Sequence, residues 1–172
     1  MENQRSRLSK IMLKNALVEL LETKPINKIT VYELCRSAQI NRSTFYKYYG
    51  EPHDVLNEII NELLEETAKI VKTENDELSR LNAILTYLRN HRETVIRIIA
   101  NMNEQKLISH IYGVPMLHEN LYNLLENSEA SIEKEYVKVF YHYGSFAIIR
   151  AWLNNGCIES PQEMTQIISS IK

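Results

Sequence analysis

The chain has 172 residues, of which only four are glycine and four are proline. Because tight turns and hairpins depend on these two residue types, their scarcity predicts an all-helical protein. A hydrophobic content of 44% and a charged content of 24% exclude a disordered chain. The longest stretch without Asp, Glu, Lys or Arg is Leu107–His118, shorter than the about 20 apolar residues of a membrane span, so we expect no membrane partner.

The net charge of −2 is unevenly distributed along the chain. Residues 1–50 carry nine Lys and Arg against four Glu, whereas residues 51–172 carry eleven against eighteen acidic residues. A basic segment followed by an acidic one suggests that the first part binds a polyanion. The charge pattern alone leaves a chance excess open as the alternative.

The two cysteines, Cys35 and Cys157, lie in distant segments of the sequence. We interpret them as free buried thiols rather than as a disulfide, which favours a reducing compartment. The first ten residues, MENQRSRLSK, lack the apolar run of a signal peptide. We therefore expect a cytoplasmic protein.

Local signals predict three helices in the basic segment. Pro25 ends the first, because the residue before a proline avoids the helical region. Thr30 and Glu33 have the spacing of a capping box, and Asn41 is placed to cap a further helix. The three helices are expected at about Arg5–Thr23, Val31–Ala38 and Arg42–Tyr48.

Six more helices and no strand are predicted after this segment, which gives about nine in total. A long helix follows Pro52, and Ser160, Pro161 and Glu163 supply an N-cap, a first-turn proline and a capping glutamate for the last one. The six are expected at about Pro52–Lys72, Asp76–Asn90, Glu93–Met102, Gln105–Asn127, Ser131–Asn155 and Pro161–Ile171.

The sequence lacks the local motifs of enzyme sites. It contains no glycine-rich phosphate loop, no nucleophile elbow, no cysteine pair at zinc spacing, and no histidine that follows an acidic residue at metal-binding spacing. We therefore expect no enzyme, no cofactor and no metal. A site assembled from distant residues would leave no such motif, so an enzyme stays a third alternative.

Residues 30–49, TVYELCRSAQINRSTFYKYY, have the pattern of a helix-turn-helix. The small residues Cys35 and Ala38 allow two helices to approach, while Leu34, Ile40, Phe45 and Tyr49 would fill the core between them. The second helix of such a motif enters the major groove of DNA. Its outward side chains could bind base edges and phosphates, although they also fit an ordinary polar surface. These side chains are Arg42, Ser43, Thr44, Tyr46 and Lys47.

The segment from the first helix to Leu56 resembles the tetracycline-repressor (TetR) family of bacterial transcriptional regulators. The resemblance rests on residues 29–31, Ala38, the run INRSTFYK at 40–47, Tyr49 and residues 55–56, with a looser match at 143–153 and 160–161. It implies an all-helical dimer with an N-terminal DNA-binding domain, residues 1–50, that binds a palindromic operator. It also implies a C-terminal helical bundle, residues 51–172, that dimerises and often holds a small-molecule inducer.

Two positions depart from the family pattern. Gln39 replaces the usual glycine of the turn and must itself adopt any left-handed backbone, at a cost of about 1 kcal/mol. Pro52, followed by His53, replaces a lysine that commonly contacts phosphate, although backbone amides at a helix start can also hold a phosphate. Together with the outward side chains of the second helix, the residues at the two helix starts complete the set of candidate DNA contacts, which are Thr30, Arg42, Ser43, Thr44, Tyr46, Lys47 and His53.

The predicted helix Ser131–Asn155 is apolar on two sides, so it needs cover on both. One stripe includes Tyr136, Val139, Tyr143 and Phe146, and a second stripe contains small residues that permit a close helix crossing. We expect this second stripe and the last helix to form a homodimer interface, with a single monomeric core as the alternative. The candidate interface residues are Tyr141, Gly144, Ile148, Ala151, Ile167 and Ile171.

The middle helices are rich in aromatic and histidine side chains. Such residues line ligand cavities, and they equally fill cores. The candidate pocket for a small-molecule effector comprises Tyr87, His91, His110, Tyr112, Met116 and Tyr122.

The sequence thus predicts a homodimeric regulator of transcription, a repressor rather than an activator, that binds a palindromic operator in double-stranded DNA. Release by a small-molecule effector is a further expectation. The alternative is a helical ligand-binding or adaptor protein that acts through protein partners and binds DNA weakly. Pro52 in place of the usual lysine favours this alternative.

Overall fold

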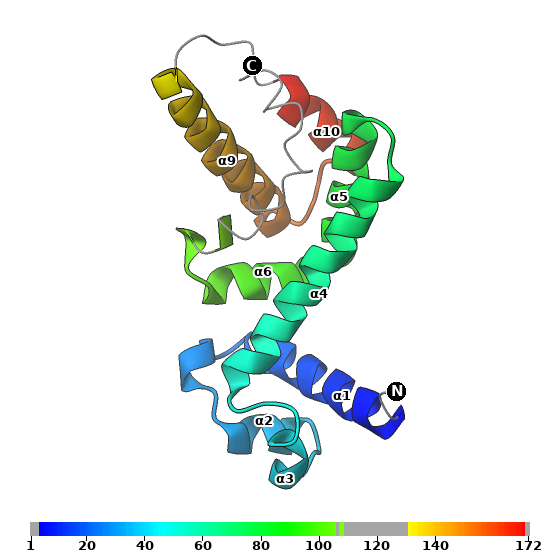
Figure 1. Cartoon of the computed structure of the whole chain (residues 1–172), viewed down its shortest axis with the longest axis vertical. Coiled ribbons are helices and arrows are strands. Elements are labelled where there is room, and N and C mark those ends of the chain that lie inside the picture. The colour runs from blue at the N-terminus through cyan, green and yellow to red at the C-terminus, as the bar shows by residue number, and fades with distance from the viewer. Residues whose placement is uncertain (1–3, 106, 109–130, 171–172) are drawn as a thin grey trace. The chain divides into compact units, whose positions relative to one another are not determined.

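The computed structural model describes residues 4–105, 107–108 and 131–170. Those residues form eight α-helices, one 3-10 helix (Ile26–Lys28) and no strand, which confirms the all-helical prediction (Figure 1). The predicted helix Gln105–Asn127 lies largely outside the described residues. The α-helices are α1 (Gln4–Leu20), α2 (Val31–Ser37), α3 (Arg42–Phe45), α4 (Pro52–Thr73), α5 (Glu77–Asn90), α6 (Arg92–Asn101), α9 (Ser131–Asn154) and α10 (Pro161–Ser170).

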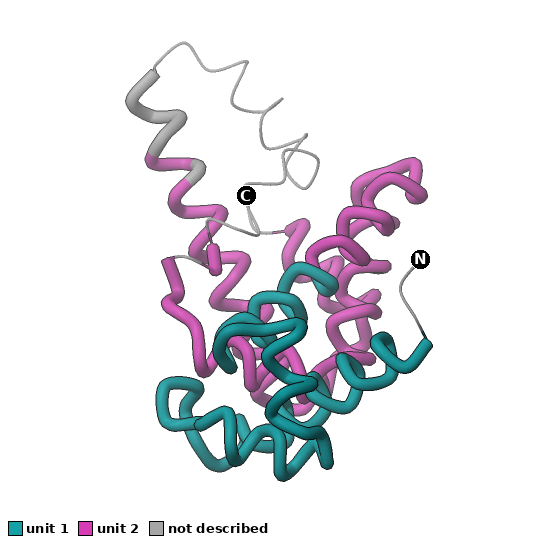
Figure 2. The backbone as a smooth tube through the Cα atoms, turned by 60° about the horizontal axis from the view of Figure 1, so that its bottom comes forward, with its two compact units in different colours: residues 1–63 teal, residues 64–172 magenta. Residues whose placement is uncertain are grey.

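The chain divides into two compact units, residues 1–63 and residues 64–172, called here the N-terminal and C-terminal units (Figure 2). The division falls inside α4, later in the chain than the boundary expected at residue 50. The N-terminal unit therefore contains α1, α2, α3 and the first half of α4.

The core of the N-terminal unit is the one expected of a helix-turn-helix. Leu34 and Phe45 are completely buried, Cys35, Ala38 and Tyr49 are nearly so, and Ile40 is half-buried. Leu13 and Leu17 of α1 and Val55 of α4 are also fully buried. This packing confirms the predicted core residues and fixes α3 against the rest of the unit.

The α3 helix is shorter than the predicted range Arg42–Tyr48. The α-helix ends at Phe45. Beyond it, the Lys47 amide donates to Thr44 at 3.3 Å and the Tyr48 amide to Phe45 at 2.9 Å, which is the bonding of tighter 3-10-like turns, although the Tyr49 amide also donates to Phe45 at 3.0 Å. β-Branched and aromatic residues dominate this stretch and favour a long α-helix poorly.

The C-terminal unit packs α10 against α5, and α9 against α6. Phe146 of α9 is buried in a cluster with Leu107 and Ile108. The predicted capping box at the start of α10 is present, because the Glu163 amide donates to Ser160 Oγ at 3.2 Å and the Ser160 amide to Glu163 Oε2 at 2.7 Å. The hydrogen bonds that the Ser160 amide and then the Ser160 hydroxyl donate to the carboxylate lower the pKa of Glu163.

Cys35 and Cys157 are both buried and unbridged, as predicted. Burial raises the pKa of each thiol. No helix in the described part of the chain is both long and apolar enough to cross a membrane.

Candidate nucleic-acid interface

The turn between α2 and α3 is held by local backbone hydrogen bonds. Gln39 has a φ of 55°, in the left-handed region that glycine adopts without strain. The amide of Ile40 donates to the carbonyl of Cys35 at 2.9 Å, which closes the end of α2. The left-handed conformation anticipated at Gln39 is therefore confirmed, and it redirects the chain into α3.

The start of α2 is fixed by the capping box predicted from the sequence. The Glu33 amide donates to Thr30 Oγ1 at 3.2 Å, and Glu33 Oε2 accepts from the Thr30 amide at 3.1 Å. The Lys24 ammonium group also pairs with the Glu33 carboxylate. The hydrogen bonds from Lys24 and then Thr30 lower the pKa of Glu33 to about 2. The Thr30 hydroxyl thus serves the cap, and a contact with DNA would have to share it.

The predicted contacts on and beyond α3 lie on the outside of the N-terminal unit. Arg42, Ser43, Tyr46 and Lys47 are exposed, whereas Thr44 is half-buried. Phe45, in the middle of the same segment, is completely buried. A single short segment therefore presents a guanidinium, two hydroxyls and an ammonium group to solvent while its opposite side anchors it in the core.

Asn41 occupies the N-cap of α3, as predicted, but its side chain makes no capping hydrogen bond. The backbone carbonyl of Asn41 accepts from the amides of Thr44 and Phe45 at 2.9 Å and 3.0 Å. The first turn of α3 is thus closed by its backbone.

Arg42 and Tyr46 are paired across one turn of this segment. The guanidinium carbon of Arg42 lies 6.0 Å from the centre of the Tyr46 ring, within the range of a cation–π contact. Hydrogen bonding and charge interaction with the Tyr46 side chain raise the pKa of Arg42. The Tyr46 ring in turn meets the buried Phe45 ring edge to face, with centroids 5.5 Å apart.

The start of α4 is capped by a carboxylate. Asp54 Oδ2 accepts from the amides of Gly50 and Glu51 at 2.8 Å and 3.0 Å. These two amides lie at the helix start that the sequence analysis considered for phosphate binding, and an acidic side chain already occupies them. His53, a predicted DNA contact, is exposed, while Pro52 is buried.

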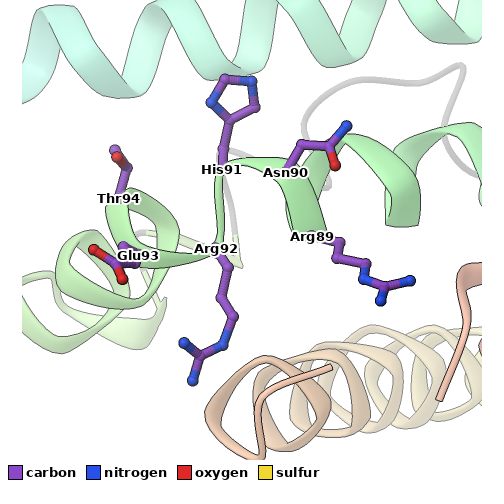
Figure 3. Close-up of a pocket in the computed structure, with 6 residues that line it drawn as sticks. All are labelled: Arg89, Asn90, His91, Arg92, Glu93 and Thr94. Carbon is purple, nitrogen blue, oxygen red and sulfur yellow. The ribbon is translucent and has the colours of Figure 1, made fainter. Parts of the chain in front are cut away.

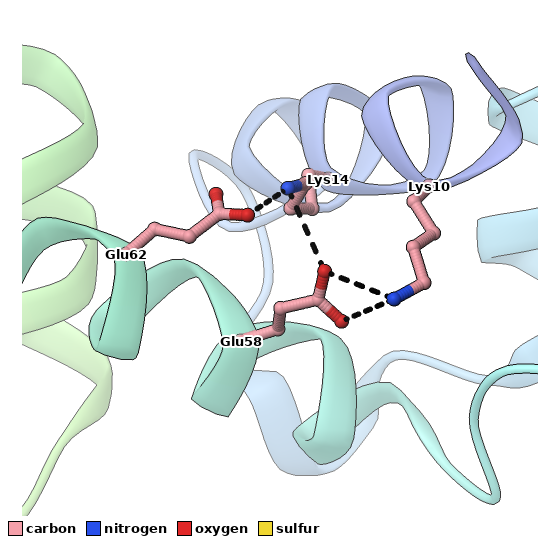
Figure 4. Close-up of polar contacts among 4 residues, drawn as sticks. All are labelled: Lys10, Lys14, Glu58 and Glu62. Atoms are coloured by element: carbon pink, nitrogen blue, oxygen red, sulfur yellow. Dashed lines mark hydrogen bonds and ion pairs between the residues drawn. The ribbon is translucent and has the colours of Figure 1, made fainter. Parts of the chain in front are cut away.

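Two of the basic side chains of the N-terminal unit face its own glutamates (Figure 4). Lys10 Nζ lies 3.4 Å from both carboxylate oxygens of Glu58, and Lys14 Nζ lies 2.5 Å from Glu62 Oε1 and 3.7 Å from Glu58 Oε1. These ion pairs join α1 to the first half of α4. They stabilise the unit, so these lysines add less to the basic outer surface than their number suggests.

Two exposed residues of α2 were not among the predicted contacts. The Tyr32 side chain is 61% exposed, and Arg36 is exposed one turn later. The first helix of a helix-turn-helix crosses the DNA backbone, where a hydroxyl and a guanidinium can bind phosphate. Their spacing of four residues on a short amphipathic helix places them on the same face, which the sequence alone could have indicated.

Two of the predicted pocket residues, Tyr87 and His91, lie in the described part of the chain, and the structure brings them together. The rings of Tyr87 and His91 lie 4.5 Å apart at the corner between α5 and α6. An open hollow of about 480 Å³ at this corner is lined by residues 89–94, all of them polar (Figure 3). Such a lining lacks the apolar walls typical of a small-molecule cavity. His110, Tyr112, Met116 and Tyr122 lie outside the described residues.

The predicted interface residues of α9 and α10 differ in exposure. Tyr141, Gly144 and Ile148 are half-buried, and Ala151 and Ile167 are exposed. Ile171 lies outside the described residues. The structure also divides the first apolar stripe, because Phe146 is buried while Tyr136, Val139 and Tyr143 remain exposed, together with Phe140.

No group of three or more His, Cys, Asp or Glu side chains able to hold a metal ion occurs within the described residues.

Comparison with known proteins gives both a family and a fold. A family model described as the transcriptional regulator C-terminal region matches residues 76–171, more than half of the chain. The structure of the TetR transcriptional regulator from Streptococcus agalactiae 2603V is similar, with a TM-score of 0.72 and 20% identity over 96% of this chain and 93% of that one. The dihydroxyacetone kinase operon activator DhaS gives a TM-score of 0.56 and 16% identity, over 95% and 93% of the two chains.

A similar curated protein is YxbF of Bacillus subtilis (strain 168), described as an HTH-type transcriptional regulator. The two sequences are 22% identical in an alignment of 163 positions that covers 90% of this chain. The match covers 42% of YxbF, so this chain spans less than half the length of that relative.

Proposed function

The chain belongs to the TetR family of transcriptional regulators, a non-enzymatic family, and we propose that it is a repressor that binds a palindromic operator as a homodimer. The observation that carries this proposal is the outward row formed by Arg42, Ser43, Tyr46 and Lys47 over the buried Phe45. A segment anchored on one side and rich in hydrogen-bond donors on the other suits a major groove.

The exposed apolar face of α9, which contains Tyr136 and Tyr143 of the first apolar stripe rather than the predicted second stripe, supports the dimer. Tyr136, Phe140 and Tyr143 are 72%, 61% and 41% exposed, and their spacing of four and three residues places them on one face of the helix. Apart from the adjacent residues and the backbone of its own helix, a Cβ atom added at Gly144 would meet no atom within 4 Å. Large exposed aromatic faces mark interaction sites, and a second copy of α9 and α10 would cover this one.

A symmetric dimer presents two copies of α3, so we expect the operator to be a near-palindrome. Its half-site centres should lie about one helical turn, or a small multiple of it, apart. The contacts proposed with DNA are those of Thr30, Arg42, Ser43, Thr44, Tyr46, Lys47 and His53.

Release by a small-molecule effector is part of the same proposal. Among the described residues its support is the Tyr87–His91 ring pair in the C-terminal unit. An expected consequence is that a ligand which binds the C-terminal unit weakens operator binding by favouring another conformation of the dimer.

Selection of bound duplexes from a random pool at near-physiological salt tests the proposal. The wild-type protein should enrich one palindrome. Lys47→Ala should weaken binding to all sequences alike, because a point charge on phosphate carries no sequence information. Failure to enrich any palindrome would contradict the proposed function.

One observation favours a second candidate, an adaptor that acts through protein partners. The Asp54 carboxylate sits on the amides of Gly50 and Glu51, next to Pro52, which replaces the lysine that the family commonly uses to contact phosphate. A negative charge at this position opposes phosphate binding. If the protein is an adaptor, it would enrich no duplex from the random pool, and protein partners captured from cells would bind the exposed face of α9.

A further inference from the structure

We propose that Tyr46 is a positioning residue that holds the Arg42 guanidinium as a fixed planar donor for one guanine in each half of the operator. The inference deepens the proposed function and rests on it, because it requires α3 to lie in a major groove.

The first step is the position of Arg42. It is the first residue of α3, and the N-terminal residues of a recognition helix are those that reach base edges. Arginine binds guanine by donating to O6 and N7 together, which requires the guanidinium plane to lie in the plane of the base. An exposed arginine has many rotamers, so most of its conformations do not meet this requirement.

The second step is the contact that restricts those rotamers. The amide of Tyr46 donates to the carbonyl of Arg42 at 3.0 Å, so the two side chains leave the segment one above the other. The guanidinium carbon then lies 6.0 Å from the centre of the Tyr46 ring. The guanidinium also forms a hydrogen bond with the Tyr46 side chain, and its remaining donors stay available to a base.

The third step is the anchor of the tyrosine. Tyr46 itself is 52% exposed, but its ring meets the ring of Phe45 at an interplanar angle of 83°. Phe45 has no exposed surface and cannot move without disturbing the core. The core therefore fixes Phe45, the Phe45 ring restricts the Tyr46 ring, and the Tyr46 ring restricts the Arg42 side chain.

The alternative role for Tyr46 is a direct contact of its hydroxyl with phosphate. The two roles differ in what they require of Arg42 and of the guanine. A phosphate contact works whether or not these two are present, whereas positioning has no effect when either is removed.

A double-mutant cycle tests the inference on the duplex enriched from the random pool. Four proteins are compared: wild type, Tyr46→Leu, Arg42→Ala and the double variant, each checked by circular dichroism and size-exclusion chromatography. Tyr46→Leu should weaken wild-type binding about three- to fivefold, the strength of an exposed cation–π contact, and should relax the preference for guanine. In the Arg42→Ala background the same change should have almost no effect.

The same proteins are then tested on a duplex in which 7-deazaguanine, which lacks the N7 acceptor, replaces each guanine of the enriched palindrome in turn. At the position read by Arg42 the effect of Tyr46→Leu should disappear. The inference would be overturned if Tyr46→Leu lowered the affinity for the duplex equally in the wild-type and Arg42→Ala proteins, or if it left the preference for guanine unchanged. Either result would leave the proposed function in place. Absence of any enriched duplex would overturn both.

Discussion

Arg92 Nε, in the first turn of α6, donates to the carbonyl oxygen of Leu153 at 2.6 Å, near the end of α9. A second guanidinium nitrogen donates to the carbonyl of Asn154 at 3.4 Å. The last carbonyls of a helix have no partner within the helix and carry its partial negative charge, so a guanidinium is well suited to them. In Figure 3, Arg92 and His91 point to opposite sides of the α5–α6 corner, which leaves Arg92 to fix the end of α9.

The first prediction concerns this contact. Arg92→Ala should lower the free energy of unfolding by about 1–3 kcal/mol, because charged hydrogen bonds to two carbonyls are lost. Urea denaturation followed by circular dichroism measures the change. The matched control is Arg150→Ala, which removes an exposed ion pair with Glu104 and should cost less than about 1 kcal/mol. Equal losses in the two variants would contradict the capping role.

The second prediction concerns the left-handed residue of the helix-turn-helix. Gln39→Gly should raise the free energy of unfolding by about 0.5–1 kcal/mol, since glycine adopts a φ of 55° without a Cβ clash. Gln39→Ala is the control, because it keeps the Cβ atom and should bring no gain. The idea fails if the glycine and alanine variants unfold at the same urea concentration.

The third prediction concerns acid stability. The pKa of Glu33 is about 2 in the folded protein against an ordinary value of 4.5, so the folded state favours the charged carboxylate. Its stabilising effect is fully present above pH 4.5 and is lost as the pH falls toward 2. Wild type should therefore be more stable than Glu33→Gln at pH 6, with the difference vanishing near pH 2.

Thermal unfolding across this pH range measures the difference. The control variant is Glu19→Gln, which alters an exposed carboxylate of α1. Its stability should fall with decreasing pH in the same way as that of wild type. A gap between wild type and Glu33→Gln that stays constant from pH 6 to pH 2 would argue against the low pKa.

The fourth prediction concerns assembly. Gly144→Glu should convert the proposed dimer to a monomer. Apart from the adjacent residues and its own helix backbone, the new Cβ atom meets nothing within 4 Å, so the monomer tolerates it, whereas the glutamate would enter the close helix crossing of the dimer. Light scattering at micromolar concentration measures the molar mass. Asn155→Glu, an exposed residue beyond the end of α9, should remain a dimer. A well-folded dimeric Gly144→Glu would place the interface elsewhere.

The fifth prediction concerns the start of α4. Asp54→Asn keeps an oxygen acceptor for the amides of Gly50 and Glu51 but removes the negative charge. Binding to all duplexes should tighten about two- to fivefold at low salt and converge with wild type at high salt. Asp76→Asn makes the same change at the N-cap of α5 in the C-terminal unit and should leave DNA binding unaltered. Identical affinities for wild type and Asp54→Asn would show that this helix start does not approach DNA.

The sequence by itself determined the features that depend on near neighbours. The capping boxes Thr30–Glu33 and Ser160–Glu163 each join residues three positions apart, so the spacing alone predicted them. The left-handed turn at Gln39 was equally readable, because a family pattern with glycine at that position implies its conformation. The outward row on α3 followed from the burial of Phe45, which helical periodicity anticipates.

Only the tertiary structure decided the contacts between distant residues. Arg92 donates to the carbonyl of Leu153, 61 residues after it along the chain, and Lys10 pairs with Glu58 across 48 residues. Charged side chains of this kind have many partners of opposite sign within reach, and the packing of the helices selects one. No local sequence pattern predicts which partner is selected.

The face of α9 left exposed was also decided by packing. The sequence grouped Phe146 with Tyr136 and Tyr143 in one apolar stripe, because all three are apolar at helical spacing. In the structure, Leu107 and Ile108 cover Phe146, while the two tyrosines stay exposed. Periodicity shows that a helix is apolar on several sides, but the neighbouring segments determine which side they bury and which remains for a partner.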